Sequence, residues 1–214
     1  LIGLTDAWPR SAGHRVDRTL QNERGRSAVN ALGALGAAHV RIDHCALDGL
    51  RRPALVPHQY GQAEVRDILG EGARTDAQAL GYVNSYLTGI RQIAESSSET
   101  DLFARPGISV KLSALHPRYS ITQEDRVFAE LLPRLKNIIR VAMEHNIAVS
   151  LDAEEANRLE LHLEIYKTLI EDPEFKQFHG IGFVLQAYQK RAIHVATALR
   201  ELAQKNSRRL PVRL

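Results

Sequence analysis

The stretch IAVSLDAEEANRLELHLEIYKTLIEDPEFKQFHGIGFVLQ, residues 147–186, decides the fold. Its first apolar run, 147–152, predicts a buried strand, and a second run at 180–186 predicts another. Between them apolar residues recur at helical spacing over 157–170, and Asp172-Pro173 ends that helix because the residue before a proline disfavours helical conformation. Two strands joined by a crossover helix predict a parallel pair with a right-handed connection.

The same alternation continues on both sides of this unit. A capping box at Thr75 and Gln78 predicts a helix that continues through Ile93. Thr122 and Asp125 predict the start of another helix, which runs to about Asn146 and which Pro133 should kink or divide. Strands are expected at 107–113 and 210–214, and a further helix at 191–204. This pattern predicts an α/β fold, either a (β/α)8 barrel of the TIM type or an open doubly wound sheet. Neither G-x-G-x-x-G nor G-x-x-x-x-G-K-[ST] occurs, which favours the barrel, with about its first five strands present.

Residues 1–64 differ from the rest of the chain. They contain no lysine, and glycines interrupt nearly every apolar run, so that the best helix candidate, 27–38, is itself weakened by Gly33 and Gly36. We therefore divide the chain into a poorly specified N-terminal segment, 1–64, and a barrel-like part, 65–214. The N-terminal segment is expected to be poorly ordered or to pack in its own way.

Charge and composition exclude several classes of protein. The chain of 214 residues has 28 Lys and Arg against 25 Asp and Glu, without a concentrated basic tract. Arg51-Arg52 and Arg208-Arg209 are isolated pairs that we interpret as solvated loop charges, so nucleic-acid binding is not expected.

The single cysteine, Cys45, excludes an internal disulfide framework and fits a reducing, cytoplasmic compartment. No apolar window is long enough to span a bilayer and no export signal is evident, so any contact with the inner membrane would be peripheral.

Four polar residues end or interrupt the predicted strands. They are Lys111, Asp152, Gln186 and Arg213. In a parallel barrel the active site lies at the carboxyl ends of the strands, so these side chains are expected to share one mouth. Polar strand ends are also common where strands meet loops, and Asp152 could merely cap the following helix. Four on consecutive strands favour a site, because buried Lys, Asp and Arg need partners or an anionic ligand.

Three motifs carry a resemblance to a known family. Residues 107–119 (GISVKLSALHPRY), 152–160 (DAEEANRLE) and 182–191 (GFVLQAYQKR) closely resemble the proline dehydrogenase domain of bacterial bifunctional proline utilisation A flavoenzymes. The resemblance covers roughly 65–214, with Leu69-Gly70-Glu71 similar to the end of the first barrel strand, and we find none in residues 1–64.

The resemblance implies an FAD enzyme that oxidises L-proline to Δ1-pyrroline-5-carboxylate and passes electrons to a membrane quinone. It implies that Lys111 contacts flavin and substrate, that Asp152 lines the proline site and organises nearby arginines, that Gln186 contacts the isoalloxazine, and that Arg213 lies beside its reactive nitrogen. The flavin would supply the redox chemistry. Lys111, Asp152 and Arg213 are thus the expected catalytic residues, and all four are expected to bind the cofactor.

Departures from the family leave alternatives open. The family's Val-Lys-Gly-Ala-Tyr-Trp segment, its last three strands, its pair of substrate-clamping arginines and its aldehyde dehydrogenase domain are not found in this sequence, so no NAD site is expected. An inactive truncated or rearranged fragment is therefore one alternative, and a barrel aldolase that uses Lys111 for a Schiff base is another. As written, the chain is expected to lack measurable proline:quinone reductase activity.

Other conspicuous residues receive no catalytic role. His39, Asp43, His44 and Cys45 follow no standard zinc spacing, so no metal site is expected. Glu154 and Glu155 are interpreted as ordinary complements to a helix dipole. His116 is interpreted as a loop residue satisfied locally.

Overall fold

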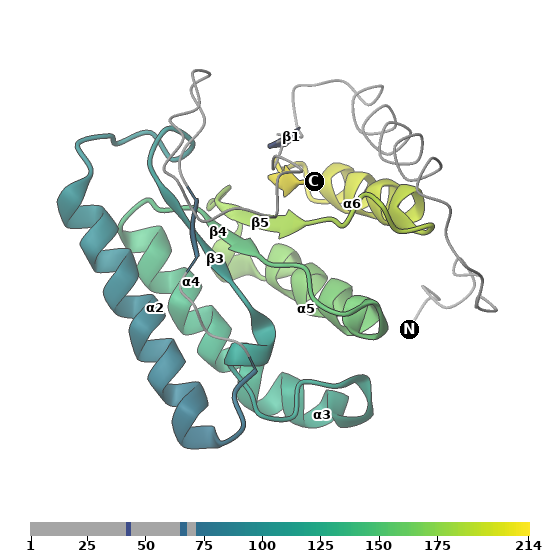
Figure 1. Ribbon diagram of the computed structural model, residues 1–214. Coiled ribbons are helices and arrows are strands. Elements are labelled where there is room, and N and C mark those ends of the chain that lie inside the picture. The colour runs from purple at the N-terminus through teal and green to yellow at the C-terminus, as the bar shows by residue number, and fades with distance from the viewer. Residues whose placement is uncertain (1–41, 44–64, 68–71) are drawn as a thin grey trace.

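The computed structural model describes residues 42–43, 65–67 and 72–214 of the chain. Six parallel strands form one sheet in the order β1-β6-β5-β4-β3-β2 (Figure 1). Their bounds are β1 Ile42–Asp43, β2 Val65–Asp67, β3 Gly107–Val110, β4 Val149–Leu151, β5 Ile181–Val184 and β6 Val212–Arg213. The predicted parallel α/β architecture is confirmed.

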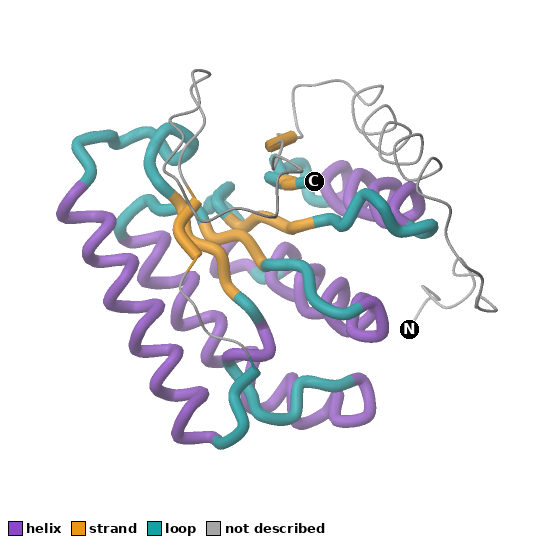
Figure 2. The backbone as a smooth tube through the Cα atoms, viewed as in Figure 1, coloured by secondary structure: helices purple, strands orange, loops and turns teal. Residues whose placement is uncertain are grey.

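Among the described residues, four long helices connect β2 to β6: α2 Asp76–Ser96, α4 Leu132–Glu144, α5 Leu159–Glu171 and α6 Ala192–Lys205. A one-turn helix, α3 Glu124–Arg126, precedes α4. Because β2 to β6 neighbour one another in chain order and parallel crossover connections are right-handed as a rule, the crossover helices are expected on one side of the sheet. Figures 1 and 2 show these helices fanned along the strands.

Local sequence explains where these helices begin and break. Thr75 caps α2 by accepting a hydrogen bond from the Gln78 amide at 3.2 Å, as the capping box predicts. The helix predicted from Thr122 to Asn146 is divided: a π-helical turn, Val127–Leu131, precedes α4, and Pro133 lies in the first turn of α4, where its missing N–H has no cost. The irregular turn thus lies just before Pro133, where a kink or a division of the helix was expected.

The core lies between the helices and the sheet. Its largest fully buried side chains include Tyr86, Tyr166, Phe175 and Phe183. Tyr166 packs edge-on against Phe183, with ring centroids 5.2 Å apart, and donates from its hydroxyl to the carbonyl of Ile181 at 3.1 Å. This contact joins α5 to β5 and satisfies a polar group that would otherwise be buried at a cost.

Two expectations differ from the observed sheet. The strand predicted at 107–113 ends at Val110, and Leu112–Ala114 form a 3₁₀ turn. About five strands were expected, but a further strand, β1, pairs with β6 in parallel, with Ile42 opposite Val212. The predicted helix at 27–38 and the order of the rest of residues 1–64 lie outside the described residues.

The interpretation of Arg208 as a solvated charge is wrong. Its side chain is buried and donates to the carbonyl of Ile170 at 3.1 Å and to the carbonyl of Phe178. Burial lowers the pKa of Arg208 below its ordinary value. Arg209 is exposed, as expected, and Arg51-Arg52 lie outside the described residues.

Within the part of the chain that the structure describes, every helix is too short or too polar to cross a membrane.

Candidate active site at the carboxyl edge of the sheet

Strand register brings the predicted site residues to one edge. Val110 pairs with Leu151, so Lys111 and Asp152 leave neighbouring strands at the same level. Arg213 lies in β6 opposite Val184, the last residue of β5, and Gln186 follows two residues later. All four therefore lie at the carboxyl ends of four consecutive parallel strands, as predicted.

Asp152 joins two cations. Its Oδ2 lies 2.5 Å from the Lys111 ammonium nitrogen, and its Oδ1 lies 3.1 Å from Nη2 of Arg213. The side chains of Asp152 and Arg213 are 16% and 17% exposed and that of Lys111 is 33% exposed, so the three charges are partly shielded from water. Arg213 also donates to the hydroxyl of Ser109 at 3.3 Å. This cluster carries a net positive charge and one accessible ammonium, a combination suited to an anionic ligand.

Backbone contacts hold the cluster in place. The amide of Lys111 donates to the hydroxyl of the fully buried Tyr86 at 3.1 Å, and the amide of Asp152 donates to the carbonyl of Val110 at 2.9 Å. Asp152 also accepts the amide of Ala153 at 3.1 Å, a contact with its own neighbour and not with the first turn of α5. The helix-capping alternative for Asp152 therefore does not describe its contacts.

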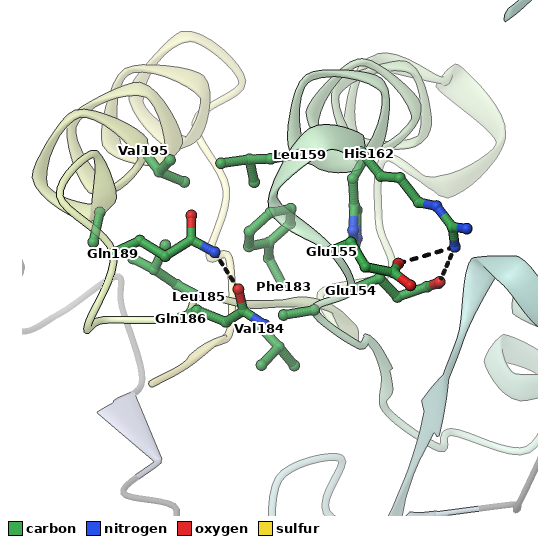
Figure 3. Close-up of a pocket in the computed structure, with 13 residues that line it drawn as sticks. Glu154, Glu155, Leu159, His162, Phe183, Val184, Leu185, Gln186, Gln189 and Val195 are labelled. Atoms are coloured by element: carbon green, nitrogen blue, oxygen red, sulfur yellow. Dashed lines mark hydrogen bonds and ion pairs between the residues drawn. The ribbon is translucent and has the colours of Figure 1, made fainter. Parts of the chain in front are cut away.

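Gln186 lies apart from this cluster. Figure 3 shows its side chain in a pocket between α5 and α6, where Gln189 donates to its amide oxygen. Lys111, Asp152 and Arg213 do not line that pocket. Gln186 thus shares the edge with the other three residues, but its side chain contacts a different group.

His162 forms part of the same pocket. Its ring is buried against Phe183, with centroids 4.8 Å apart, and its Nε2 has no hydrogen-bond partner among the described residues. Burial lowers the pKa of His162 to about 4, so the ring is neutral at physiological pH.

His116 is buried in the loop after β3. Its Nε2 lies 2.9 Å from Oε2 of Glu130, and its Nδ1 accepts the amide of Arg118 at 3.1 Å. Hydrogen bonds from Arg126 and then from His116 lower the pKa of Glu130 to about 2. The contact with Arg118 is local, as expected, while Glu130 belongs to the next helical segment.

The two acids after Asp152 differ in burial and contacts, and the interpretation of Glu154 as a complement to a helix dipole is incomplete. Glu154, with a side chain only 7% exposed, accepts the amide of Ser113 at 2.9 Å and pairs with Arg158 at 3.0 Å. Glu155 is 66% exposed. Neither side chain caps the helical turn that follows. The sequence did not predict the contacts of Glu154 and Tyr86, because each contact joins segments that are distant in the sequence.

Over residues 42–43, 65–67 and 72–214, no three His, Cys, Asp or Glu side chains gather closely enough to hold a metal ion. His39, His44 and Cys45 lie outside the described residues.

Comparison with known proteins identifies the family. The sequence model of the proline dehydrogenase family matches residues 57–214, beginning within the segment where we found no resemblance. The bifunctional protein PutA of Klebsiella aerogenes is 49% identical over 148 residues, which are 69% of this chain and 11% of that protein. PutA of Rhizobium meliloti is 43% identical over 140 residues, again 11% of its length.

Solved structures agree with this assignment. A proline utilization A mutant from Bradyrhizobium japonicum has a TM-score of 0.68 and 43% identity, covering 72% of this chain and 16% of that one. A second bifunctional proline utilization A structure, at 35% identity and the same TM-score, covers 98% of this chain and 22% of its own. This chain thus spans about a tenth of the length of its curated PutA relatives. Together with the parallel sheet and the three matching motifs, the family match shows that the chain belongs to the proline dehydrogenase family.

Proposed function

We propose that this chain serves in the FAD-dependent oxidation of L-proline to Δ1-pyrroline-5-carboxylate, the first step of proline catabolism. One observation carries the proposal: in a chain of the proline dehydrogenase family, Asp152 lies between Lys111 and Arg213 at the carboxyl edge of a parallel sheet. That edge is where parallel α/β enzymes place their chemistry.

The same chain is proposed to form an arc of a (β/α)8 barrel. In a doubly wound sheet the strand order reverses at a switch point, whereas β2 to β6 follow one another in chain order without reversal. An unreversed order with helices on one side is the arrangement that a closed barrel requires. The proposed barrel-like part is 65–214, with 1–64 as a separate N-terminal segment.

The cluster fits an anionic substrate beside a flavin. Bound FAD would supply the hydride acceptor. The ammonium of Lys111, one-third exposed, is placed to attract the carboxylate of proline, while Asp152 keeps the ammonium and the Arg213 guanidinium oriented. A guanidinium at this position would favour the electron-rich form of the cofactor. Gln186 follows β5, which lies between β4 and β6, and it is proposed to contact the isoalloxazine ring system of the flavin.

The test is anaerobic addition of L-proline to the natural protein that contains these 214 residues, purified with its flavin. We expect loss of the oxidised-flavin absorbance with L-proline and none with glycine, which lacks the secondary-amine ring that becomes the imine. A colourless protein that gains no flavin on reconstitution would favour the inactive-fragment alternative. A flavin-loaded protein whose spectrum ignores proline would refute the proposed substrate.

Electron transfer to a membrane quinone follows only from the family. A cytoplasmic location with peripheral contact to the inner membrane follows from the sequence, and both belong to the proposal. Reoxidation of the proline-reduced protein by a soluble quinone analogue checks the first. Co-sedimentation with anionic lipid vesicles checks the second.

The geometry does not favour the aldolase alternative. A Schiff-base lysine must present an unprotonated amine, whereas the Lys111 nitrogen lies 2.5 Å from a carboxylate oxygen and donates to it. Borohydride trapping of a carbonyl compound on Lys111 would reverse this conclusion.

A further inference from the structure

The loops that follow β3 and β4 are joined by a buried carboxylate. Glu154 lies two residues after Asp152, and its Oε1 accepts the amide of Ser113, two residues after Lys111, at 2.9 Å. A carboxylate that accepts a backbone N–H makes a charge-assisted bond, stronger than one between neutral groups. This bond therefore ties together the two loops that present the Lys111–Asp152 pair.

Two hydrogen bonds join the neighbouring segments on either side of the Lys111–Asp152 ion pair. On the strand side, the amide of Asp152 donates to the carbonyl of Val110 at 2.9 Å, and on the loop side Glu154 accepts from Ser113. Lys111 and Asp152 lie between these links. Strand pairing alone holds only the first side, so the second link determines how closely the two loops approach where the strands end.

The charge of Glu154 is compensated locally. Its Oε2 lies 3.0 Å from Nη1 of Arg158, whose guanidinium carbon lies 5.4 Å from the centroid of the buried Tyr119 ring. A buried carboxylate without a cation would be costly and would compete with Asp152 for the ammonium of Lys111. Because Arg158 pairs with Glu154, the Glu154 carboxylate can hold the amide of Ser113 without competing with Asp152 for the ammonium of Lys111.

We propose that Glu154 is a positioning residue that sets the geometry of the Lys111–Asp152 pair through the amide of Ser113. The catalytic consequence rests on the function proposed above, whereas the geometric one does not. Glu155 is the matched control, because it also pairs with Arg158, at 3.1 Å, but is exposed and makes no contact with Ser113 in the described structure.

The experiment compares E154A, E154Q and E155A in the natural flavin-loaded protein that contains this chain. The first readout is the rate of acylation of Lys111 by limiting acetic anhydride, measured by peptide mass spectrometry. Lys136, which pairs with the distant Asp172 at 2.6 Å and is similarly exposed, is the internal standard. The second readout is kcat and KM for proline-dependent flavin reduction.

We expect E154A to raise the acylation of Lys111 relative to Lys136 several-fold and to lower kcat by roughly tenfold, the loss of about one charged hydrogen bond. E154Q keeps an acceptor for Ser113 and should restore the acylation ratio, and E155A should match the wild type in both readouts. If E154A cannot be purified, E154D takes its place, because it keeps the charge but withdraws the carboxylate from Ser113.

An unchanged acylation ratio in E154A, or an equal rise in E155A, would overturn the proposal. Acylation requires neither flavin reduction nor proline. A wild-type protein that fails to oxidise proline would therefore refute the proposed function and leave the acylation comparison to decide the role of Glu154.

Discussion

Replacing Asp152 with Asn removes one negative charge and keeps the shape of the side chain. The amide oxygen can still accept from the amide of Ala153, which now donates to Oδ1 at 3.1 Å. Lys111 and Arg213 would lose their shared counterion, and the new NH2 group of Asn would face one of them as a second donor. The substitution therefore tests the charge of Asp152 separately from its volume.

The loss in the free energy of unfolding can be bounded from the exposure of the three side chains. Exposed ion pairs contribute about 0.2–1 kcal/mol, and breaking a fully buried pair costs about 3–5 kcal/mol. With two members at 16% and 17% exposure and the third at 33%, we expect a loss of about 2 kcal/mol in the free energy of unfolding. For a chain of this length that loss corresponds to roughly 4–8 °C in Tm.

The D152N substitution should also lower activity. If Asp152 orients both cations toward substrate and cofactor, loss of its charge removes about 1.5–3 kcal/mol of charged hydrogen bonding, or roughly 10- to 100-fold in the rate of flavin reduction by proline. Stopped-flow absorbance of the flavin-loaded D152N protein and its thermal unfolding measure the two effects. An unchanged reduction rate in a folded D152N protein would refute the assigned role of Asp152.

Three further outcomes follow from the structure. Arg208→Met should lower the free energy of unfolding in urea by about 2–4 kcal/mol, because the carbonyls of Ile170 and Phe178 lose their donor in a buried site. His162, whose pKa is lowered by burial to about 4, stays neutral in the fold while the unfolded chain takes up a proton near pH 6.5. Its contribution is thus fully present above about pH 6.5 and is lost progressively toward pH 4, by at most about 3 kcal/mol, as urea unfolding across that range would measure. Gly81→Ala should raise the free energy of unfolding by about 0.5–1 kcal/mol, because Gly81 lies within α2 and its added methyl meets open space.

Each outcome has a matched control. Arg209→Met alters an exposed neighbour and should leave stability unchanged, so an equal loss there would contradict the burial argument. His162→Gln should flatten the acid side of the pH profile, and an unaltered slope would assign it to other groups. Gly107→Ala places a methyl 3.0 Å from the carbonyl oxygen of Ala148 and should cost about 1–3 kcal/mol, opposite in sign to the change in α2.

The fold could be predicted because each strand and helix unit carries its own apolar pattern. The five strands from β2 to β6 neighbour one another in chain order, so local periodicity and the right-handed rule suffice for most of the topology. Boundaries were less predictable. The strand from Gly107 ends at Val110 because the next amide, that of Lys111, donates to the side chain of Tyr86, a partner 25 residues away in α2.

The pairing of β1 with β6 could not be predicted. A strand of two residues, Ile42–Asp43, has no period to read, and its pairing with Val212 and Arg213 depends entirely on contacts that are remote in sequence. Such pairings are decided by the edge that the rest of the sheet leaves available.

The site was predictable where strand geometry dictates it. Lys111, Asp152 and Arg213 lie at the carboxyl ends of β3, β4 and β6 of one parallel sheet, and that position alone brings them to one edge. Gln186 occupies the same edge, but the direction of its side chain depends on Gln189, which lies in the turn before α6. Arg208 was misjudged because a pair of arginines before a strand has the same local pattern whether its side chains are solvated or buried.

The three acids of the segment after β4 show how packing, and not residue type, assigns their roles. Asp152 faces two cations at the edge of the sheet, Glu154 is enclosed with an amide and Arg158, and Glu155 is two-thirds exposed. Asp152 and Glu154 are two residues apart, and they contact two residues of the neighbouring segment with the same spacing, Lys111 and Ser113. Because Arg158 compensates the middle acid, the first acid is left as the carboxylate that organises Lys111, and a pattern of acidic residues in sequence could not have distinguished between them.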